Sequence, residues 1–361
     1  MKYYVIAGEA SGDLHASNLI KEIKNLRPDS QFRCWGGDLM KSQGAELVKH
    51  YRELAFMGFT EVVLNLRTIL KNIELCKKDI LEYKPDALIL VDYPGFNLRI
   101  AEFAKKHELK VIYYISPQVW AWKQSRVHKI KNIVDKMIVI LPFEKDFYKK
   151  FDYDVDFVGH PLLDAIDEKK DAKLNISAEK PVIAILPGSR RQEIATMLPI
   201  MLNIWNEFKD YEFVIAGAPS VPEEFYKKYI DSKNVRIVYN QTYDLLKKAT
   251  AALVTSGTAT LETALFEVPE VVCYKGGKIS YLIAKNLIKV KYIALANLIM
   301  EKEIIKELIQ DDFNESNLKA ELNKILNNEN RIKIIEQYKI LKNKLGGPGA
   351  SHRAAELIVN S

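Results

Sequence analysis

The sequence contains no uninterrupted apolar run of about 18 residues, the length that a membrane-spanning helix requires. Its first eight residues lead directly into an apolar, strand-like stretch, without the basic and then apolar segments of a secretory leader. We therefore expect a cytoplasmic protein whose contact with a membrane would have to be peripheral.

Cysteine is also scarce. Cys34, Cys76 and Cys273 are odd in number and widely spaced, which is typical of reduced thiols in a cytoplasmic protein. Neither these cysteines nor His128 and His160 have partners at the spacing of metal ligands. The sequence therefore predicts no metal site and no other cofactor.

An excess of charge of one sign is lacking as well. The formal net charge is +6 in a chain with 53 basic and 47 acidic residues. This mild surplus is compatible with acidic small molecules or an anionic membrane surface, and it is too diffuse to indicate nucleic acid.

What the sequence does contain is a regular alternation of short apolar runs with amphipathic stretches. Such runs, rich in β-branched residues, are typical of parallel strands that helices cover on both faces. The runs lie at 3–7, 87–91, 111–115, 137–141, 182–186, 213–216, 235–239, 251–254 and 271–274. The pattern predicts an α/β protein with doubly wound parallel sheets.

The chain is longer than one hydrophobic core usually supports, which suggests two domains. A polar, lysine-rich segment around 152–181 marks the boundary, and each half opens with a strand, a glycine turn and a helix. We expect Rossmann-like domains at 1–158 and 159–345 that face each other across a cleft.

The last residues have their own pattern. Glycines and a proline at 346–349 break the chain, and 351–360 read as a short helix with Ser351 as its N-cap. This helix, within residues 350–361, could cross back to brace the first domain.

The N-terminal glycine turn, GEASGD at 8–13, is a poor phosphate site. It lacks the lysine and hydroxyl of a P-loop, and Glu9 and Asp13 would repel a diphosphate. Asp13 suits the N-cap of the following helix. The free N–H groups of the turn could still hold sugar hydroxyls or a water molecule.

The second glycine turn, LPGSRRQE at 186–193, has the opposite chemistry. Gly188 permits a close backbone approach, Ser189 offers a hydroxyl, and Arg190 and Arg191 supply guanidinium groups at the start of a helix. This combination favours a diphosphate.

A third turn places Ser256, Gly257 and Thr258 at another strand-to-helix junction, with Glu262 one helical turn further on. Glu262 could accept both hydroxyls of a ribose, so the two turns together suggest a nucleoside diphosphate. The alternative is that both are ordinary capped helix starts.

Asp92 stands at the end of an apolar strand, before Pro94 and Gly95, with Asn97 close behind. A partly desolvated carboxylate in that place is a candidate general base for a hydroxyl nucleophile. A turn or capping residue is the alternative interpretation.

Two further stretches remain open in meaning. Residues 54–73 carry a helical apolar stripe led by Phe56, Met57 and Phe59 and continued by Val63, which suits either packing on the sheet or contact with membrane and acyl chains. The segment 117–131 combines Trp120 with Lys123 and Arg126, as expected of a site for an anionic, partly lipidic molecule, of a nucleic-acid contact, or of a solvated basic helix face.

The motifs together resemble the lipid-A-disaccharide synthase family, GT-B glycosyltransferases of Gram-negative bacteria. The segments that carry the resemblance are AGEASGD (7–13), SPQVWAWKQSRVHKI (116–130), LPFEKDFY (141–148), GHPLLDAI (159–166), LPGSRRQE (186–193) and SGTATLE (256–262). The likeness extends from Ala7 to about residue 308.

The resemblance implies an inverting, metal-independent transfer from UDP-2,3-diacylglucosamine to the 6-hydroxyl of 2,3-diacylglucosamine 1-phosphate (lipid X), which gives a β-1,6-linked disaccharide 1-phosphate and UDP. It implies a cytoplasmic enzyme, peripheral on the inner face of the cytoplasmic membrane, that binds no nucleic acid, and it leaves a homodimer open.

By the same resemblance Asp92 is the base, Arg190 contacts the donor diphosphate, Glu262 the ribose, and Asn297 lines the nucleotide pocket. The first domain then binds the acceptor and the second the donor. The residues expected on the acceptor side are Gly8, Glu9, Ser11, Gly12, Trp120, Lys123 and Arg126.

Two positions depart from the family pattern. Gly95 replaces the second aspartate of the usual D-x-P-D-F-N, which leaves Asp92 as the one carboxylate candidate in its loop. Ala296 replaces a proline before Asn297, which we expect to loosen the turn.

Other functions share this architecture. A different UDP-sugar enzyme, such as a UDP-N-acetylglucosamine 2-epimerase, and a non-catalytic nucleotide-sugar-binding protein are the alternatives, because a fold does not determine a function.

Overall fold

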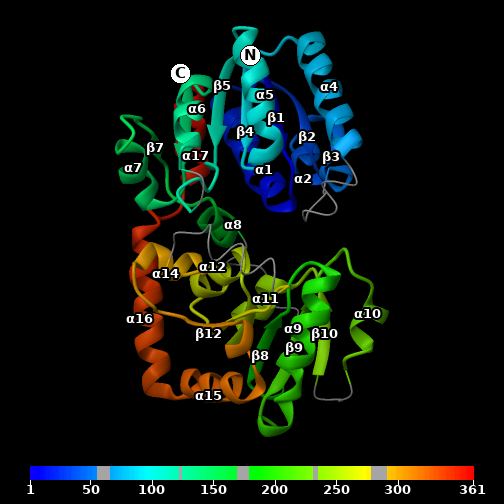
Figure 1. Cartoon of the computed structure of the whole chain (residues 1–361), viewed down its shortest axis with the longest axis vertical. Coiled ribbons are helices and arrows are strands. Elements are labelled where there is room, and N and C mark those ends of the chain that lie inside the picture. Colours follow the sequence, from blue (N-terminus) through cyan, green and yellow to red (C-terminus); the bar gives the residue numbers. More distant parts are fainter. Residues whose placement is uncertain (55–65, 122–123, 169–178, 231–234, 278–290) are drawn as a thin grey trace. The chain divides into compact units, whose positions relative to one another are not determined.

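The computed structural model describes residues 1–54, 66–121, 124–168, 179–230, 235–277 and 291–361. The chain forms two compact units: Met1–Asp164 together with Leu345–Ser361, and Ala165–Lys344. Each unit contains one parallel sheet with helices between its strands, which confirms the predicted α/β class (Figure 1).

The first unit is built on a seven-stranded sheet. In sheet order its strands are β3 (Glu46–His50), β2 (Gln31–Gly36), β1 (Lys2–Ala7), β4 (Ala87–Val91), β5 (Lys110–Tyr114), β6 (Lys136–Val139) and β7 (Asp156–Phe157). The described pairs are all parallel. Strand β4 is buried at all its positions, because helices cover both faces of a doubly wound sheet.

The helices of the first unit are α1 (Ala10–Leu26), α2 (Asp38–Ser42), α4 (Leu66–Tyr83), α5 (Pro94–Lys106), α6 (Arg126–Ile133), α7 (Pro142–Lys149), α8 (Leu162–Glu168, which runs into the second unit) and α17 (Ala350–Val359). A short 3-10 helix, η1, spans Tyr51–Glu53. Helix α1 packs against α2 and α17, whereas α5 packs against α4 and α6.

The second unit has a six-stranded sheet in the order β10 (Val235–Tyr239), β9 (Glu212–Gly217), β8 (Val182–Leu186), β11 (Ala249–Thr255), β12 (Glu270–Tyr274) and β13 (Lys306–Ile309). Its helices are α9 (Arg191–Asn203), α10 (Glu223–Lys227), α11 (Thr242–Lys248), α12 (Thr258–Leu265), α14 (Leu295–Met300), α15 (Glu315–Leu326) and α16 (Asn328–Lys344), with 3-10 turns η2 (Trp205–Glu207) and η3 (Gln310–Asp312).

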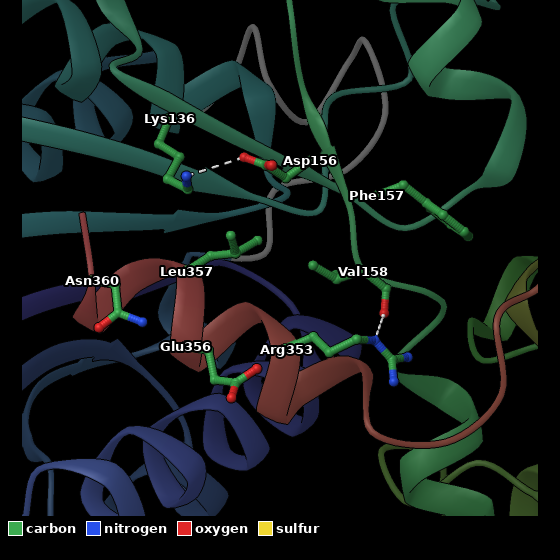
Figure 2. A pocket seen from close by; sticks show the side chains of 8 residues that line it. All are labelled: Lys136, Asp156, Phe157, Val158, Arg353, Glu356, Leu357 and Asn360. Atoms are coloured by element: carbon green, nitrogen blue, oxygen red, sulfur yellow. Dashed lines mark hydrogen bonds and ion pairs between the residues drawn. The ribbon is translucent and has the colours of Figure 1, made fainter.

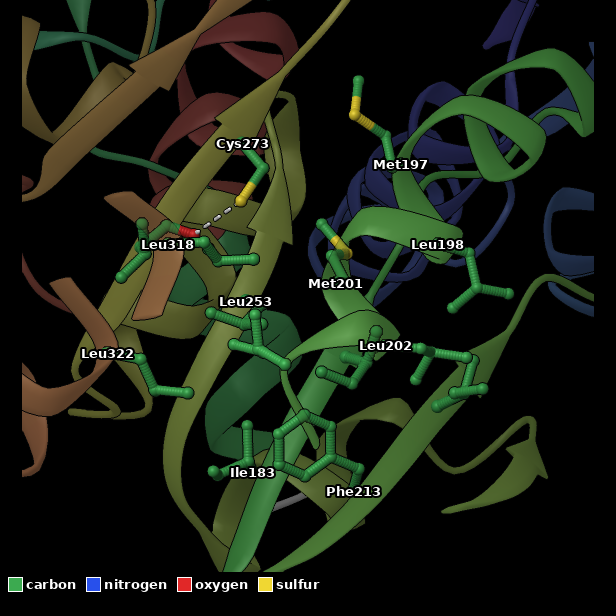
Figure 3. Packing of buried hydrophobic residues seen from close by; sticks show 14 of the residues in the cluster. Ile183, Met197, Leu198, Met201, Leu202, Phe213, Leu253, Cys273, Leu318 and Leu322 are labelled. Carbon is green, nitrogen blue, oxygen red and sulfur yellow. Dashed lines mark hydrogen bonds between the residues drawn. The ribbon is translucent and has the colours of Figure 1, made fainter. Parts of the chain in front are cut away.

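One face of this second sheet packs on α9 and α15. Met197 and Met201 of α9, Leu253 of β11 and Leu318 and Leu322 of α15 belong to one buried cluster (Figure 3). Full burial of one such side chain stabilises the folded unit by about 1.5–3 kcal/mol. This core fixes the sheet from which the turns of the second unit project.

The C-terminal residues complete the first unit. Helix α17, red in Figure 1, lies against α1, and the His352 Nδ1 atom is 2.9 Å from a Glu22 carboxylate oxygen. The predicted helix is present, but Ser351 is not its N-cap. Gly349 holds that position, and the Asp164 carboxylate accepts the N–H groups of Gly349, Ala350 and Ser351 at 2.6, 3.2 and 2.8 Å.

Both sheets have a topological switch point, where the strand order reverses. It lies between β1 and β4 in the first sheet and between β8 and β11 in the second. In open parallel sheets ligands bind at such points, beyond the carboxyl ends of the strands. The turns after these four strands are therefore where a site is expected in each unit.

Candidate active site

In the first unit the switch point brings together Glu9 and Asp92, which follow β1 and β4. These strands pair with Ala7 opposite Val91, so the two acidic residues leave the sheet side by side. Asp92 directly follows the buried strand ALILV, and Pro94 then begins α5, where its missing N–H costs nothing.

Burial, and next the negative charge of Glu9, raise the pKa of Asp92 to about 6. A carboxylate with a pKa this close to neutrality can take a proton from a hydroxyl and still be ionised at pH 7. The sequence suggested Asp92 as the one carboxylate candidate in its loop. The structure adds Glu9, from a segment 83 positions earlier, as its electrostatic partner.

The space that the second aspartate of the family pattern would occupy is open. A Cβ atom at Gly95 would meet no other atom within 4 Å. The packing around this position therefore does not require a glycine. Among nearby carboxylates, Glu9 has the largest effect on the pKa of Asp92.

In the GEASGD segment, Gly8 and Gly12 lie close to neighbouring protein atoms. A Cβ atom on Gly8 would lie 2.3 Å from the Tyr93 ring, so this glycine lets Tyr93 pack onto the turn. The Tyr93 hydroxyl donates to the Leu54 carbonyl at 3.1 Å. Gly12 is buried close to Ala7, and Ser11 remains partly exposed.

Asp13 does not cap its own helix, contrary to the sequence interpretation. Helix α1 already begins at Ala10, with Glu9 as N-cap, and Asp13 lies within its first turn. The Asp13 carboxylate instead accepts the N–H groups of Gly37, Leu39 and Met40 at 2.8, 3.1 and 3.1 Å, and so caps α2.

The tryptophan segment follows β5 of the same sheet. Trp120 is 8% exposed and packs edge-on against Phe143, with ring centroids 4.9 Å apart, whereas Arg126 begins α6 and is partly exposed. Lys123 lies outside the described residues. The charge and partial exposure of Arg126 suit contact with an anion.

The buried carboxylate of Glu144, which the sequence did not suggest as a site residue, holds the start of the tryptophan segment in place. Ser116 donates to the Glu144 carboxylate, which also accepts the N–H groups of Ile140 and Leu141 at 3.2 and 2.9 Å. Burial raises the pKa of Glu144 to about 7. The LPFEK motif thus anchors the start of the tryptophan segment.

In the second unit the turns after β8 and β11 flank the switch point. Leu186 pairs with Val254, so the Gly188–Arg190 turn and the Ser256–Thr258 turn lie at the same edge of the sheet. Helices α9 and α12 begin there, and their N-termini supply N–H groups and partial positive charge.

The first of these turns already holds an internal anion. Gly188 has a φ of +109°, and the Glu193 carboxylate accepts the N–H groups of Ser189 and Arg190 at 3.1 and 3.3 Å. The Arg190 guanidinium donates to the same carboxylate at 3.0 Å. The groups that were predicted to bind a diphosphate therefore converge on one carboxylate.

The second turn is more open. Ser256 extends the sheet through a 3.0 Å bond from its N–H to the Cys273 carbonyl, and a Cβ atom on Gly257 would touch nothing within 4 Å. Thr258 is exposed, and Glu262 accepts the Tyr243 hydroxyl at 3.1 Å. The free space at Gly257 suits a close approach of a ligand.

Asn297 has a structural use that the sequence did not suggest. Its side chain is fully buried, and its amide donates to the Ile305 carbonyl and the Glu307 carboxylate, both at 2.8 Å. Its oxygen accepts the N–H groups of Ile304 and Ile305 at 2.8 and 3.0 Å. These four bonds use the full capacity of the amide.

Ala296 lies inside α14 and is fully buried. The replacement of a proline therefore does not loosen a turn at this point, because the residue continues a helix.

The predicted membrane contacts Phe56, Met57, Phe59 and Val63 lie outside the described residues. Helix α4 carries the rest of that stripe and exposes Leu70, Leu75 and Leu81. Among the helices of the described residues, none is long and apolar enough to cross a membrane. The same residues contain no group of three potential metal ligands.

A cavity of about 520 Å³ lies elsewhere in the first unit, between strands β6 and β7 and helix α17 (Figure 2). Lys136 pairs with Asp156 at 3.1 Å, and Arg353 donates to the Val158 carbonyl at 2.8 Å on its wall. None of the predicted site residues lines this cavity.

Solved structures show that the fold is shared with a UDP-GlcNAc 2-epimerase and with a glycosyltransferase. A UDP-GlcNAc 2-epimerase from Neisseria meningitidis superimposes with a TM-score of 0.70 over the full length of both chains at 13% identity. The glycosyltransferase of kitacinnamycin gives 0.67 at 14% identity, over 99% of this chain and 98% of the other. At these identities the likeness establishes the fold alone.

The sequence comparisons are more specific. The lipid-A-disaccharide synthase of Syntrophus aciditrophicus is 42% identical over 97% of this chain and 95% of its own length. Lipid-A-disaccharide synthase 1 of Legionella pneumophila (strain Lens) is 38% identical over 98% and 96%. A sequence model described as lipid-A-disaccharide synthetase matches residues 3–360. The chain belongs to the lipid-A-disaccharide synthase family.

Proposed function

We propose that this protein is an inverting hexosyltransferase of lipid A biosynthesis. It transfers 2,3-diacylglucosamine from its UDP donor to the 6-hydroxyl of 2,3-diacylglucosamine 1-phosphate, and it releases the β-1,6-linked disaccharide 1-phosphate and UDP. The observation that carries this proposal is the family match over residues 3–360. The fold alone does not determine the activity.

Asp92 takes the proton of the acceptor hydroxyl in this reaction. The raised pKa and the place beyond β4 at the switch point support this role. The oxygen of the acceptor attacks the anomeric carbon as the bond to UDP breaks, and the proton passes to the carboxylate. A single displacement of this kind inverts the anomeric configuration. Gly8, Glu9, Ser11, Gly12, Trp120, Lys123 and Arg126 make up the proposed acceptor side.

The second unit binds the departing UDP. Ser189 and Arg190 at the start of α9, and Ser256, Gly257 and Thr258 at the start of α12, offer N–H groups, hydroxyls and one guanidinium to the diphosphate. Glu262 serves the ribose, and Asn297 acts by holding the start of α14 through its four internal bonds.

The acylated substrates suggest that the enzyme works on the inner face of the cytoplasmic membrane. Each acyl CH₂ that leaves water contributes about 0.8 kcal/mol, so a small apolar patch suffices for reversible contact. Replacing Phe56 and Phe59 with serine should weaken co-sedimentation with liposomes while the protein stays folded. Retained co-sedimentation would remove these residues from the contact.

The reaction itself is tested with purified protein, UDP-2,3-diacylglucosamine and lipid X. We expect UDP release only when both substrates are present. Asp92→Ala should lower turnover by about 10²–10⁴-fold and keep the affinity for UDP, because it removes proton transfer alone. Arg190→Ala should weaken donor binding or turnover. Absence of UDP release with both substrates would refute the proposed function, and conversion of UDP-N-acetylglucosamine to its 2-epimer would support the epimerase alternative.

A further inference from the structure

The backbone of Asp92 and Tyr93 adopts a conformation that side chains rarely allow. Their φ angles are +46° and +48°, in the left-handed region that favours glycine. The Asp92 N–H still continues the sheet, with a 3.2 Å bond to the Tyr114 carbonyl. The backbone therefore changes direction at Asp92 itself. The Asp92 N–H still belongs to the sheet, and the change in direction comes before the Asp92 carbonyl.

Two side chains donate hydrogen bonds to the Asp92 carbonyl, which this change in direction turns out of the sheet. The Tyr113 hydroxyl donates to the Asp92 oxygen at 2.6 Å, and the Asn97 amide nitrogen donates to it at 2.7 Å. Both side chains are fully buried. Burial raises the pKa of Tyr113 well above 10, so its hydroxyl keeps its proton and remains a donor.

Asn97 also joins the ends of the two strands at the switch point. Its amide nitrogen lies 3.3 Å from the Val91 carbonyl of β4 and 3.5 Å from the Ile6 carbonyl of β1. The residue thus fixes the position of Asp92 relative to the strand that leads to Glu9.

We propose that Asn97 and Tyr113 are positioning residues that hold Asp92 in its left-handed conformation and thereby direct its carboxyl group. This inference rests on the proposed role of Asp92 as the base. A non-glycine residue persists in this region only where its surroundings impose the conformation. Without the two bonds the backbone relaxes to negative φ, and the Cα–Cβ bond of Asp92 turns away from its present direction.

Tyr113→Phe tests the inference, because it removes one hydroxyl and keeps the ring that fills the core. We expect kcat to fall about tenfold to a hundredfold, the usual result of a displacement of about 1 Å at a reacting group. The KM for the UDP donor should stay unchanged. The acid limb of the pH profile of kcat/KM should move to lower pH, because a carboxyl group released from its buried place regains an ordinary pKa.

Tyr4→Phe is the matched control. Tyr4 is a fully buried tyrosine of the same sheet whose hydroxyl bonds to Asp79 at 2.5 Å, and it has no contact with Asp92 among the described interactions. This variant should lose a similar amount of thermal stability and keep the wild-type kcat and pH profile. Asn97→Ala, where it folds as judged by circular dichroism, should reproduce the kinetic effect of Tyr113→Phe.

Wild-type kcat and pH profile in Tyr113→Phe would overturn the inference, as would a loss of activity equal to that of Tyr4→Phe. Asp92→Asn separates the two levels of the argument. If Asp92→Asn abolishes turnover and Tyr113→Phe is silent, the positioning role is wrong and the base is right. If Asp92→Asn retains turnover, the proposed base itself is wrong.

Discussion

The negative charge of Glu9 acts on Asp92, although the two residues belong to distant segments of the sequence. With the pKa of Asp92 raised to about 6, the ionised base is lost as the pH falls below 6. We expect the acid limb of kcat/KM near pH 6. In Glu9→Gln the limb should move to lower pH, because removal of the neighbouring negative charge makes ionisation of Asp92 easier.

Glu108→Gln is the control for the charge change. Glu108 is exposed in the same unit and makes none of the described side-chain interactions. Its profile should match the wild type. A limb that stays in place in Glu9→Gln would show that burial alone sets the pKa of Asp92.

Glu193 gives a second prediction at the scale of a single residue. Its carboxylate occupies the N–H groups of Ser189 and Arg190, so a diphosphate has to displace it. Glu193→Gln should bind UDP about threefold to tenfold more tightly, since a neutral acceptor competes less well for charge-assisted bonds. Isothermal titration calorimetry measures the change.

Glu223→Gln removes the same charge from an exposed position on α10 and should leave UDP affinity unchanged. Weaker binding in Glu193→Gln would mean that Glu193 organises the turn for the ligand and does not compete with it.

At the scale of the element, the Asp164 carboxylate caps α17 from a segment nearly 190 positions earlier in the chain. Asp164→Ala leaves three N–H groups without this acceptor and should lower the free energy of unfolding of the first unit by about 1–3 kcal/mol. Urea denaturation measures it. Asp167→Ala, at an exposed position of α8, the helix that also contains Asp164, should have little effect. Equal midpoints for the two variants would contradict the capping role.

The central strands β4 and β8 could be predicted from the sequence, whereas the edge strand β3 could not. The runs at 87–91 and 182–186 are apolar throughout because both faces of β4 and β8 are buried. Strand β3, at the sheet edge, is only partly buried and reads ELVKH. Its sequence resembles that of a loop, because this segment is a strand only through its pairing with β2.

The residue types of the candidate site were predictable where the chemistry is local. Glycine, serine and arginine before a helix indicate an anion site without any tertiary information. The roles of Asp13, Asn97 and Asn297 depend on partners far away in the sequence or on a specific turn of the backbone. A single sequence does not show which distant residues lie close together in the fold.

At the scale of the whole molecule, two buried histidines of the first unit, His15 in α1 and His160 after β7, lower the stability in acid. Burial lowers the pKa of His15 to about 4 and that of His160 to about 3, and their rings meet edge to face at 6.3 Å. Both values lie below the ordinary 6.5. The unfolded chain therefore binds more protons below pH 6.5, and these residues reduce stability as the pH falls toward 4.

His15→Gln removes one of these contributions. The stability of the variant relative to the wild type should rise by up to about 3 kcal/mol between pH 7 and pH 4. Three of the four tryptophans lie in residues 1–164, so fluorescence during urea unfolding reports mainly on the first unit. His128→Gln, which removes an exposed imidazole on α6, is the control for the substitution. A constant difference between His15→Gln and the wild type would show that His15 does not titrate below pH 6.5.

The return of α17 to the first unit has a consequence for biosynthesis. The ribosome must make the 180 residues from Ala165 to Lys344 before it reaches the helix that covers α1. At about 5–20 residues per second this takes roughly 10–40 s. Throughout that interval the nascent first unit keeps open the surface that later buries Ala354 and Ile358, and a chaperone at the exit tunnel would meet it there.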